Sequence, residues 1–226
     1  MPATTIAIDG PAASGKTALG QRLAARLSFL FFDTGVMYRA VTLAALRRNL
    51  DLESEQQIGE LAETAELDVR PPSAADGRLS DVWLDGEDVT NLIRTAEVDR
   101  SVSLVSSHAR VRKAMTRRQR QIGLRGGVVM VGRDIGTGVL PEAEVKIYLD
   151  AAPEVRARRR MRQGEGRETY EQTLEAILRR DSIDSTRAVA PLRPAEDAHV
   201  LDTSARSIED VVAWASQLTG ATAAED

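Results

Sequence analysis

Short apolar runs alternate with longer amphipathic segments along the chain, and this alternation predicts a parallel sheet covered by helices. Residues 4–8 form a β-branched, apolar run that is typical of a buried strand, and a helical pattern of leucines follows. Residues 29–32 predict a second buried strand, after which Asp33 or Thr34 is expected to cap another helix. Strand, loop, helix, strand and helix in this order begin an open α/β sheet.

The middle of the chain has a different pattern. Residues 67–70 and 82–86 predict two short antiparallel strands separated by a turn-rich stretch. We therefore expect a small β insertion over about residues 66–95, leading into helices near 96–107 and 109–123.

The strand and helix pattern of the parallel sheet then resumes. The fold class predicted from the whole pattern is α/β. The remaining elements are expected as strands at 127–131, 145–149 and 199–201 and as helices near 153–162, 168–186 and 207–218.

Composition narrows the class of protein. A chain of 226 residues can fill one α/β core with an added lobe or lid. It contains no run of about 18 apolar residues and no signal-peptide pattern, so we expect a cytoplasmic protein that does not contact membranes. It has no cysteine, which excludes disulfides and thiolate sites. We expect a monomer.

The distribution of charge indicates the kind of ligand. The net charge of −4 argues against a general nucleic-acid binder. Arginines nevertheless gather at 110–120, 156–162 and 179–187, which favours local sites for small phosphorylated molecules.

Residues 10–17 match the phosphate-loop pattern G-x-x-x-x-G-K-[ST]. Small residues let backbone amides surround a phosphate at a helix N-terminus, Lys16 adds a mobile charge, and Thr17 offers a hydroxyl to Mg²⁺. An accidental glycine-rich turn is the alternative, but the strand before the loop and the helix after it favour a nucleoside triphosphate site. The predicted nucleotide-binding residues are Gly10, Pro11, Ala12, Ala13, Ser14, Gly15, Lys16, Thr17 and the adjacent Ala18.

A phosphate loop alone does not identify the reaction. A GTP-binding switch needs an Asn-Lys-x-Asp segment, which the chain lacks, and a motor or helicase would usually be larger. A switch or assembly ATPase stays open as the alternative to a kinase.

Three further motifs favour an acceptor that itself carries phosphate. Thr34 and Arg39 combine a hydroxyl and a guanidinium at the end of the second strand, where parallel sheets bind ligands. Each residue also has a structural alternative to ligand binding: Arg39 could lie on a solvated helix face, and Tyr38 could be a core aromatic residue. Arg133 and Asp134 follow strand 127–131 and suit a ligand site, although a structural ion pair between them is possible.

The third motif lies at the end of an arginine-rich helical region. Arg180, Asp184 and Arg187 are spaced i, i+4 and i+7 and therefore share one helix face. A surface salt-bridge ladder is the alternative. The segment 188–192 that follows is apolar, which indicates that the Arg187 end of this Arg180–Asp184–Arg187 stripe points into the protein.

With these residues assembled, the chain closely resembles the bacterial cytidylate kinases, from Ile6 to the helix near Trp214. The resemblance implies phosphorylation of CMP and dCMP by ATP with Mg²⁺. It also implies a P-loop NTPase-type core at about 1–33, 124–155 and 188–226, a monophosphate-binding lobe at about 34–123 and a short lid at about 156–170. The similar stretches are residues 10–17, 33–39, 84–90, 93–95, 111–114, 117–120, 132–137, 146–149 and 184–192.

The resemblance also implies roles for individual residues. Thr34, Arg39 and Arg133 would hold the acceptor phosphate, with Tyr38 beside them. Lys16, Arg39 and Arg133 would align the reacting groups, and lid arginines would screen the migrating phosphoryl group. The ribose and phosphates of the acceptor would be reached by Arg180, Asp184 and Arg187. Cytosine would be recognised by Ser103, Arg112 and Asp134. The candidate lid arginines are Arg156, Arg158, Arg159 and Arg162, and Arg159 is taken as catalytic.

Cytosine recognition by Asp134 has a chemical reason of its own. Cytosine presents an amino group at C4, which a carboxylate accepts, whereas uracil presents a carbonyl there. A site built to pair such a donor rejects the analogue that lacks it by up to roughly 10⁴. A UMP kinase, or a kinase for another small acceptor, is the nearest rival.

The chain departs from the family pattern at three places. Thr34 stands where many relatives carry serine, and Ala18 replaces a hydroxyl residue common just after the loop. The lid at 162–167 is short, which puts its phosphate contacts in most doubt.

Overall fold

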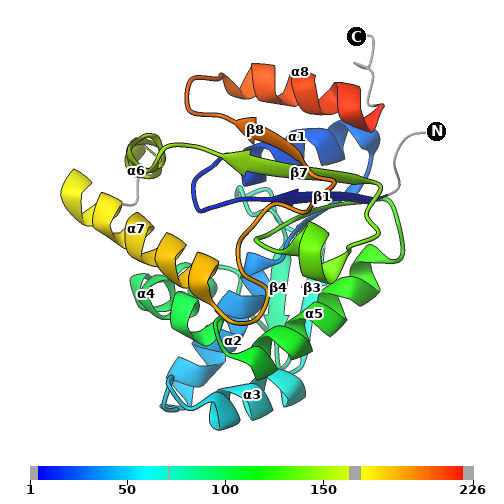
Figure 1. The fold of residues 1–226 in the computed structure, drawn as a ribbon. Helices are drawn as coiled ribbons and strands as arrows, with labels where there is room; N and C mark the ends of the chain where they lie inside the picture. Colours follow the sequence, from blue (N-terminus) through cyan, green and yellow to red (C-terminus); the bar gives the residue numbers. More distant parts are fainter. Residues whose placement is uncertain (1–4, 71, 163–168, 221–226) are drawn as a thin grey trace. The chain divides into compact units, whose positions relative to one another are not determined.

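The computed structural model describes residues 5–70, 72–162 and 169–220, and the chain divides into two compact units. The first unit comprises residues 1–31 and 123–226, and the second comprises residues 32–122 (Figure 1).

A five-stranded sheet forms the centre of the first unit. Its strand order is β2-β6-β1-β7-β8, and the pairs β1–β6, β1–β7 and β7–β8 are all parallel. Ile8 lies opposite both Val131 and Ile147, so β1 and β6 end at nearly the same level, while β7 continues to Asp150. The strands are β1 Thr5–Asp9, β2 Leu30–Asp33, β6 Val128–Val131, β7 Val145–Asp150 and β8 His199–Asp202.

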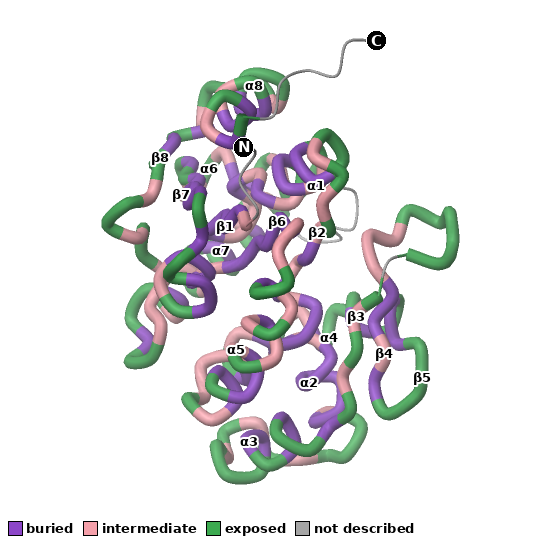
Figure 2. Tube along the Cα trace, turned by 90° about the vertical axis from the view of Figure 1, so that its right-hand side faces the viewer, coloured by how far each residue is buried: buried purple, intermediate pink, exposed green. Residues whose placement is uncertain are grey.

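Helices bury the apolar side chains of this sheet. The helix after β1 packs against the last helix of the chain, and a core of strand and helix residues lies at this contact (Figure 2). Each fully buried leucine or isoleucine of this core stabilises the fold by about 1.5–3 kcal/mol. The helical elements are α1 Lys16–Leu27, the π-helical turn η2 Ile135–Val139, α6 Pro153–Arg162, α7 Tyr170–Thr186 and α8 Ile208–Thr219.

The second unit combines helices with a small antiparallel sheet. The sheet has the order β3-β4-β5, and the guanidinium of Arg78 bonds Asp76, Asp81 and Asp88 beside it. Its elements are α2 Gly35–Arg47, α3 Glu55–Thr64, β3 Leu67–Arg70, β4 Asp81–Leu84, β5 Glu87–Asp88, the 3₁₀ turn η1 Leu92–Arg94, α4 Ala96–Val105 and α5 Ala109–Gly123.

The predicted fold class, a parallel sheet covered by helices with an inserted β element, is confirmed. The expectation that residues 29–32 form a buried strand is wrong in part. Leu30 is 42% exposed, and among the residues of β2 only Phe32 is fully buried, because β2 lies at the edge of the sheet. Helix α3 was not predicted. Among the described helices, none has the length and apolar character needed to cross a membrane.

Candidate functional site

The phosphate loop leaves the carboxyl end of β1 and bends sharply at three left-handed residues. Gly10, Ala13 and Gly15 have φ values of 143°, 59° and 100°. A Cβ atom at Gly10 would lie 2.0 Å from the backbone oxygen of Leu149, so only glycine fits against β7. Gly15 is the N-cap of α1, and since it has no side chain, it leaves the helix N-terminus open to an anion.

The side chain of Lys16 folds back over the loop. Its Nζ donates to the carbonyl oxygen of Pro11 at 2.5 Å and lies 3.4 Å from Oγ of Ser14. The side chain is buried, and the flexible stem of a lysine would allow these contacts to be exchanged for phosphate oxygens.

A pocket of about 470 Å³ opens over the loop. Its polar end contains the loop amides together with guanidinium groups, and Leu149, Ile208 and Val211 supply apolar surface. Anion-binding groups and apolar side chains in one pocket suit a nucleoside triphosphate. The lining residues are Ala13, Ser14, Gly15, Lys16, Thr17, Ala18, Leu149, Arg159, Arg160, Arg162, Thr203, Arg206, Ser207, Ile208 and Val211.

Thr203 connects the loop to the neighbouring elements, and no motif indicated it. Its hydroxyl lies 3.1 Å from the carbonyl oxygen of Ser14 and 3.0 Å from that of Asp150. Arg159 donates to both the hydroxyl and the carbonyl of Thr203, at 2.9 and 2.6 Å. The predicted catalytic Arg159 lines the pocket, and its bonds to Thr203 hold it at the end of β8.

The other arginines of α6 have unequal surroundings. Arg156 is 3% exposed, bonds the carbonyl of Ala151 and forms two hydrogen bonds with Asp181 of α7. Arg158 lies over the ring of Tyr170 at 6.0 Å, and Arg162 lines the pocket. Residues 163–168 of the predicted lid lie outside the described residues.

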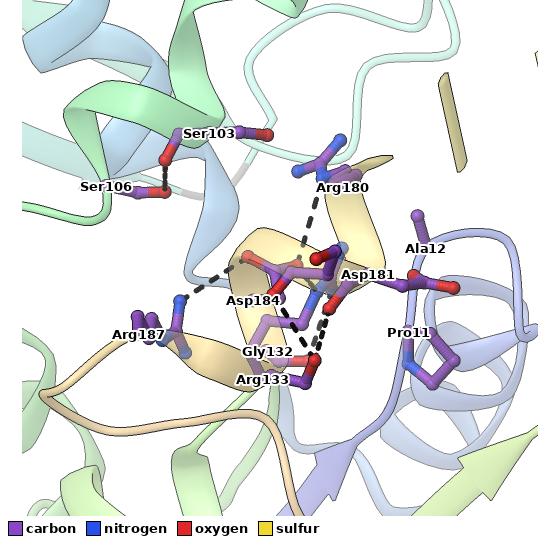
Figure 3. Close-up of polar contacts among 12 residues, drawn as sticks. Pro11, Ala12, Ser103, Ser106, Gly132, Arg133, Arg180, Asp181, Asp184 and Arg187 are labelled. Carbon is purple, nitrogen blue, oxygen red and sulfur yellow. Dashed lines mark hydrogen bonds and ion pairs between the residues drawn. The ribbon is translucent and has the colours of Figure 1, made fainter. Parts of the chain in front are cut away.

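Asp184 gathers the arginines of the predicted stripe. Its carboxylate lies 2.9 Å from Nε of Arg133, 4.0 Å from Arg180 and 3.5 Å from Arg187 (Figure 3). Asp184 is 4% exposed, so the stripe is not a surface ladder. Arg187 also lies 3.5 Å from Asp134.

Burial by itself raises the pKa of Asp184, but the guanidinium groups of Arg133, Arg180 and Arg187 outweigh burial and hold this pKa below its usual value. The cluster carries three guanidinium groups around one carboxylate. Its excess positive charge suits a phosphate group.

The second unit contains the remaining predicted residues. Arg39 donates to Asp99 at 2.5 Å and to the carbonyl of Ile93 at 3.0 Å. Its side chain is 18% exposed, so it does not lie on a solvated helix face. Thr34 is the buried N-cap residue of α2.

Tyr38 and Arg112 form one contact in the same unit. Tyr38 is buried, as expected of a core aromatic residue, and the guanidinium of Arg112 lies 5.3 Å from its ring centre. Arg112 is only 2% exposed and donates to the carbonyl of Ser106 at 3.2 Å. Ser103 lies one helical turn before Ser106, whose hydroxyl bonds the Ser103 carbonyl (Figure 3).

Sequence reasoning missed several residues that position this machinery. They are Asp9, Asp99, Asp181 and Thr203, which hold loops or arginines in place. Of these four residues, only Asp9 could have been suspected from the sequence, because it directly precedes the phosphate loop.

Comparisons with known proteins identify the family of the chain. The chain is 50% identical over 211 residues to a cytidylate kinase of Anoxybacillus flavithermus and 47% identical over 210 residues to one of Bacillus subtilis; each match covers 92% of both chains. A solved shikimate kinase from Bacteroides thetaiotaomicron matches 94% of this chain and 96% of its own, with 12% identity and a TM-score of 0.45. The family model described as cytidylate kinase matches residues 6–220, and the chain belongs to this family.

Proposed function

We propose that this chain transfers the γ-phosphoryl group of ATP directly to CMP or dCMP, which yields CDP or dCDP. The observation that carries the proposal is the parallel pairing of β1 and β6. The phosphate loop follows β1, while Arg133 and Asp134 follow β6, and Ile8 and Val131 are register partners. Donor-binding and acceptor-binding residues therefore start from the same edge of one sheet, where such sheets bind ligands.

The donor side uses the phosphate loop and its pocket. Loop amides and the N-terminus of α1 would bind the β-phosphate of ATP, and Lys16 would reach the β and γ oxygens. Arg159 and the other guanidinium groups of the pocket would surround the transferring group, with the nucleoside over Ile208 and Val211.

Thr17 is the residue proposed to hold Mg²⁺. Mg²⁺ keeps several waters and takes few protein ligands when phosphate oxygens are available. Over residues 5–70, 72–162 and 169–220 no three acidic, histidine or cysteine side chains gather as a metal site, and a hydroxyl at the loop fits this sparse ligand set. When bound, the ion neutralises charge on the β- and γ-phosphates.

The acceptor side uses residues of both units. Arg133 and Arg187 in the first unit, with Arg39 and Thr34 in the second, are proposed to hold the phosphate of CMP. Arg180 and Asp184 would bind the ribose, and Tyr38 would support Arg112. In this proposal residues 34–123 form the monophosphate-binding lobe and 156–170 the lid.

Asp134 is proposed to accept the 4-amino hydrogen of cytosine, with Ser103 and Arg112 contacting the rest of the base. Uracil would place a carbonyl oxygen against the carboxylate. One charged hydrogen bond contributes about 1.5–3 kcal/mol, which is why CMP and dCMP should exceed UMP by about 100-fold or more in kcat/KM.

The chemistry requires alignment more than covalent catalysis. The attacking phosphate oxygen of CMP and the leaving oxygen of ATP must lie in line, and cationic groups must stabilise charge on the transferring phosphoryl group. Lys16, Arg39, Arg133 and Arg159 are assigned to these tasks. We place this activity in the cytoplasm and in a monomer, with small-molecule ligands and no nucleic acid.

A panel of acceptors tests the proposal. CMP, dCMP, UMP, AMP and shikimate are each incubated with ATP and Mg²⁺, and the diphosphate or phosphorylated product is quantified. CDP and dCDP should dominate, and Lys16→Ala should abolish their formation while circular dichroism and melting temperature stay close to wild type. Equal turnover of UMP would contradict cytosine recognition, and nucleotide-dependent binding of another protein without any phosphorylated acceptor would favour a switch protein.

A further inference from the structure

Asp9 is a buried carboxylate that the proposed mechanism does not use. It ends β1, immediately before Gly10 of the phosphate loop, and is 5% exposed. Its Oδ1 accepts the backbone N–H of Ile135 at 2.8 Å, and its Oδ2 accepts that of Gly136 at 2.8 Å. Both oxygens of one side chain are therefore bonded to consecutive residues of another strand-end loop.

These two amides open the π-helical turn η2, whose N-cap residue is Asp134. The first amides of a helical turn have no partner within the turn, and an aspartate at the N-cap usually accepts one of them. Asp134 makes no such side-chain bond. Asp9 supplies it from a neighbouring strand, and the Asp134 carboxylate lies 3.5 Å from Arg187 instead.

We propose that Asp9 is a positioning residue for acceptor specificity: by capping η2 through Ile135 and Gly136, it directs the Asp134 carboxylate away from its own turn and toward the acceptor base. The inference rests on the proposed function, since it assigns Asp9 an effect through the residue that recognises cytosine.

Asp9 also lies next to the phosphate loop. The same residue precedes Gly10, which packs against the Leu149 carbonyl with no room for a Cβ atom. Asp9 therefore adjoins the phosphate loop through its backbone and bonds η2 through its side chain. Lys16 and Asp134 are the charged groups that act on Asp9 from these two loops.

The substitution Asp9→Asn tests this role. An amide has one acceptor oxygen, so its NH₂ group must face the N–H of either Ile135 or Gly136, which displaces the turn. We expect the CMP-to-UMP ratio of kcat/KM to fall by about 10-fold or more, mostly through a higher KM for CMP. The dissociation constant of ATP, measured without acceptor, should change less than about 3-fold.

A matched control is Asp150→Asn. Asp150 also ends a strand of this sheet, but it is exposed, and its side chain accepts the N–H of the adjacent Ala151. This variant should keep the wild-type ratio. Gly136→Ala is a second variant in case Asp9→Asn does not fold: its Cβ atom would lie 3.2 Å from Cδ of Lys146 and 3.5 Å from Oδ2 of Asp9, so it should shift the same turn and lower the same ratio.

A double-mutant cycle separates positioning from general destabilisation. If Asp9 acts through Asp134, adding Asp9→Asn to Asp134→Asn should lower the CMP-to-UMP ratio by less than about 2-fold. Additive losses, or an unchanged ratio in both Asp9→Asn and Gly136→Ala, would overturn the inference. A wild-type enzyme that does not prefer CMP over UMP would instead refute the proposed function.

Discussion

Asp9 and Asp184 are both buried carboxylates, and their surroundings shift their pKa values in opposite directions. Burial raises the pKa of Asp9 to about 6, although the amides of Gly136 and Ile135 and the charge of Lys16 act against burial. Three guanidinium groups lower the pKa of Asp184. The Asp9 carboxylate is bonded to backbone amides, and the Asp184 carboxylate is surrounded by guanidinium groups.

The raised pKa of Asp9 makes a prediction about stability and pH. An acid whose pKa is higher in the fold than in the unfolded chain favours folding below its unfolded pKa, and this contribution is lost as pH rises to about 6. Relative to wild type, Asp9→Asn should therefore gain up to about 3 kcal/mol in unfolding free energy between pH 4 and pH 7. Urea unfolding of both proteins at pH 4 and at pH 7 measures this gain. The prediction is contradicted if the unfolding free energies of Asp9→Asn and wild type differ by the same amount at both pH values.

Residues of the site differ in how far sequence could predict them. Lys16 and Thr17 belong to a contiguous motif whose chemistry is local, so their place in the pocket followed from eight consecutive residues. Asp9 and Thr203 act through partners more than 100 residues away along the chain. Such pairings depend on strand order, which spacing along one sequence does not contain.

An ion pair between Arg156 and Asp181 joins helices α6 and α7, and its removal should destabilise the fold. Arg156 is 3% exposed and is bonded to Asp181, at 2.5 Å in the shorter contact. Removing one partner of such a pair leaves a buried charge and usually costs about 3–5 kcal/mol. Asp181 is itself partly exposed, so we expect Asp181→Ala to lower the unfolding free energy by about 2–4 kcal/mol.

Glu209→Ala is the control for this prediction, because its pair with Arg22 is exposed to solvent and should contribute much less to the unfolding free energy than the Arg156–Asp181 pair. Thermal and urea unfolding compare the two variants. A similar small loss in both would mean that Asp181 does not stabilise the α6–α7 contact through Arg156.

The helices differ in how well the sequence predicted them. The predicted helix at 153–162 and α6 have the same bounds, whereas α3 was missed. Helix α3 contains Gly59, which lowers helix propensity by about 1 kcal/mol. A Cβ atom there would lie 2.7 Å from Cβ of Arg110, so glycine is required by packing against α5, which the sequence alone does not show.

At the scale of the whole molecule, the proposed acceptor residues are divided between two compact units. Arg39, Ser103 and Arg112 belong to residues 32–122, while Arg133, Asp134 and Arg187 belong to the other unit. Their common role followed from the family resemblance, not from periodicity. It stays a prediction, because each unit is described by itself.

The central claim is that ATP phosphorylates a cytosine nucleotide which Asp134 recognises. Asp134→Asn tests it most directly, with kcat/KM measured for CMP and for UMP. An amide can turn either its oxygen or its NH₂ group toward the base, so the variant should accept both nucleotides. The CMP-to-UMP ratio should fall from about 100 or more in wild type to below about 5 in Asp134→Asn, with little change in ATP affinity. A ratio that stays at the wild-type value in Asp134→Asn would contradict the account.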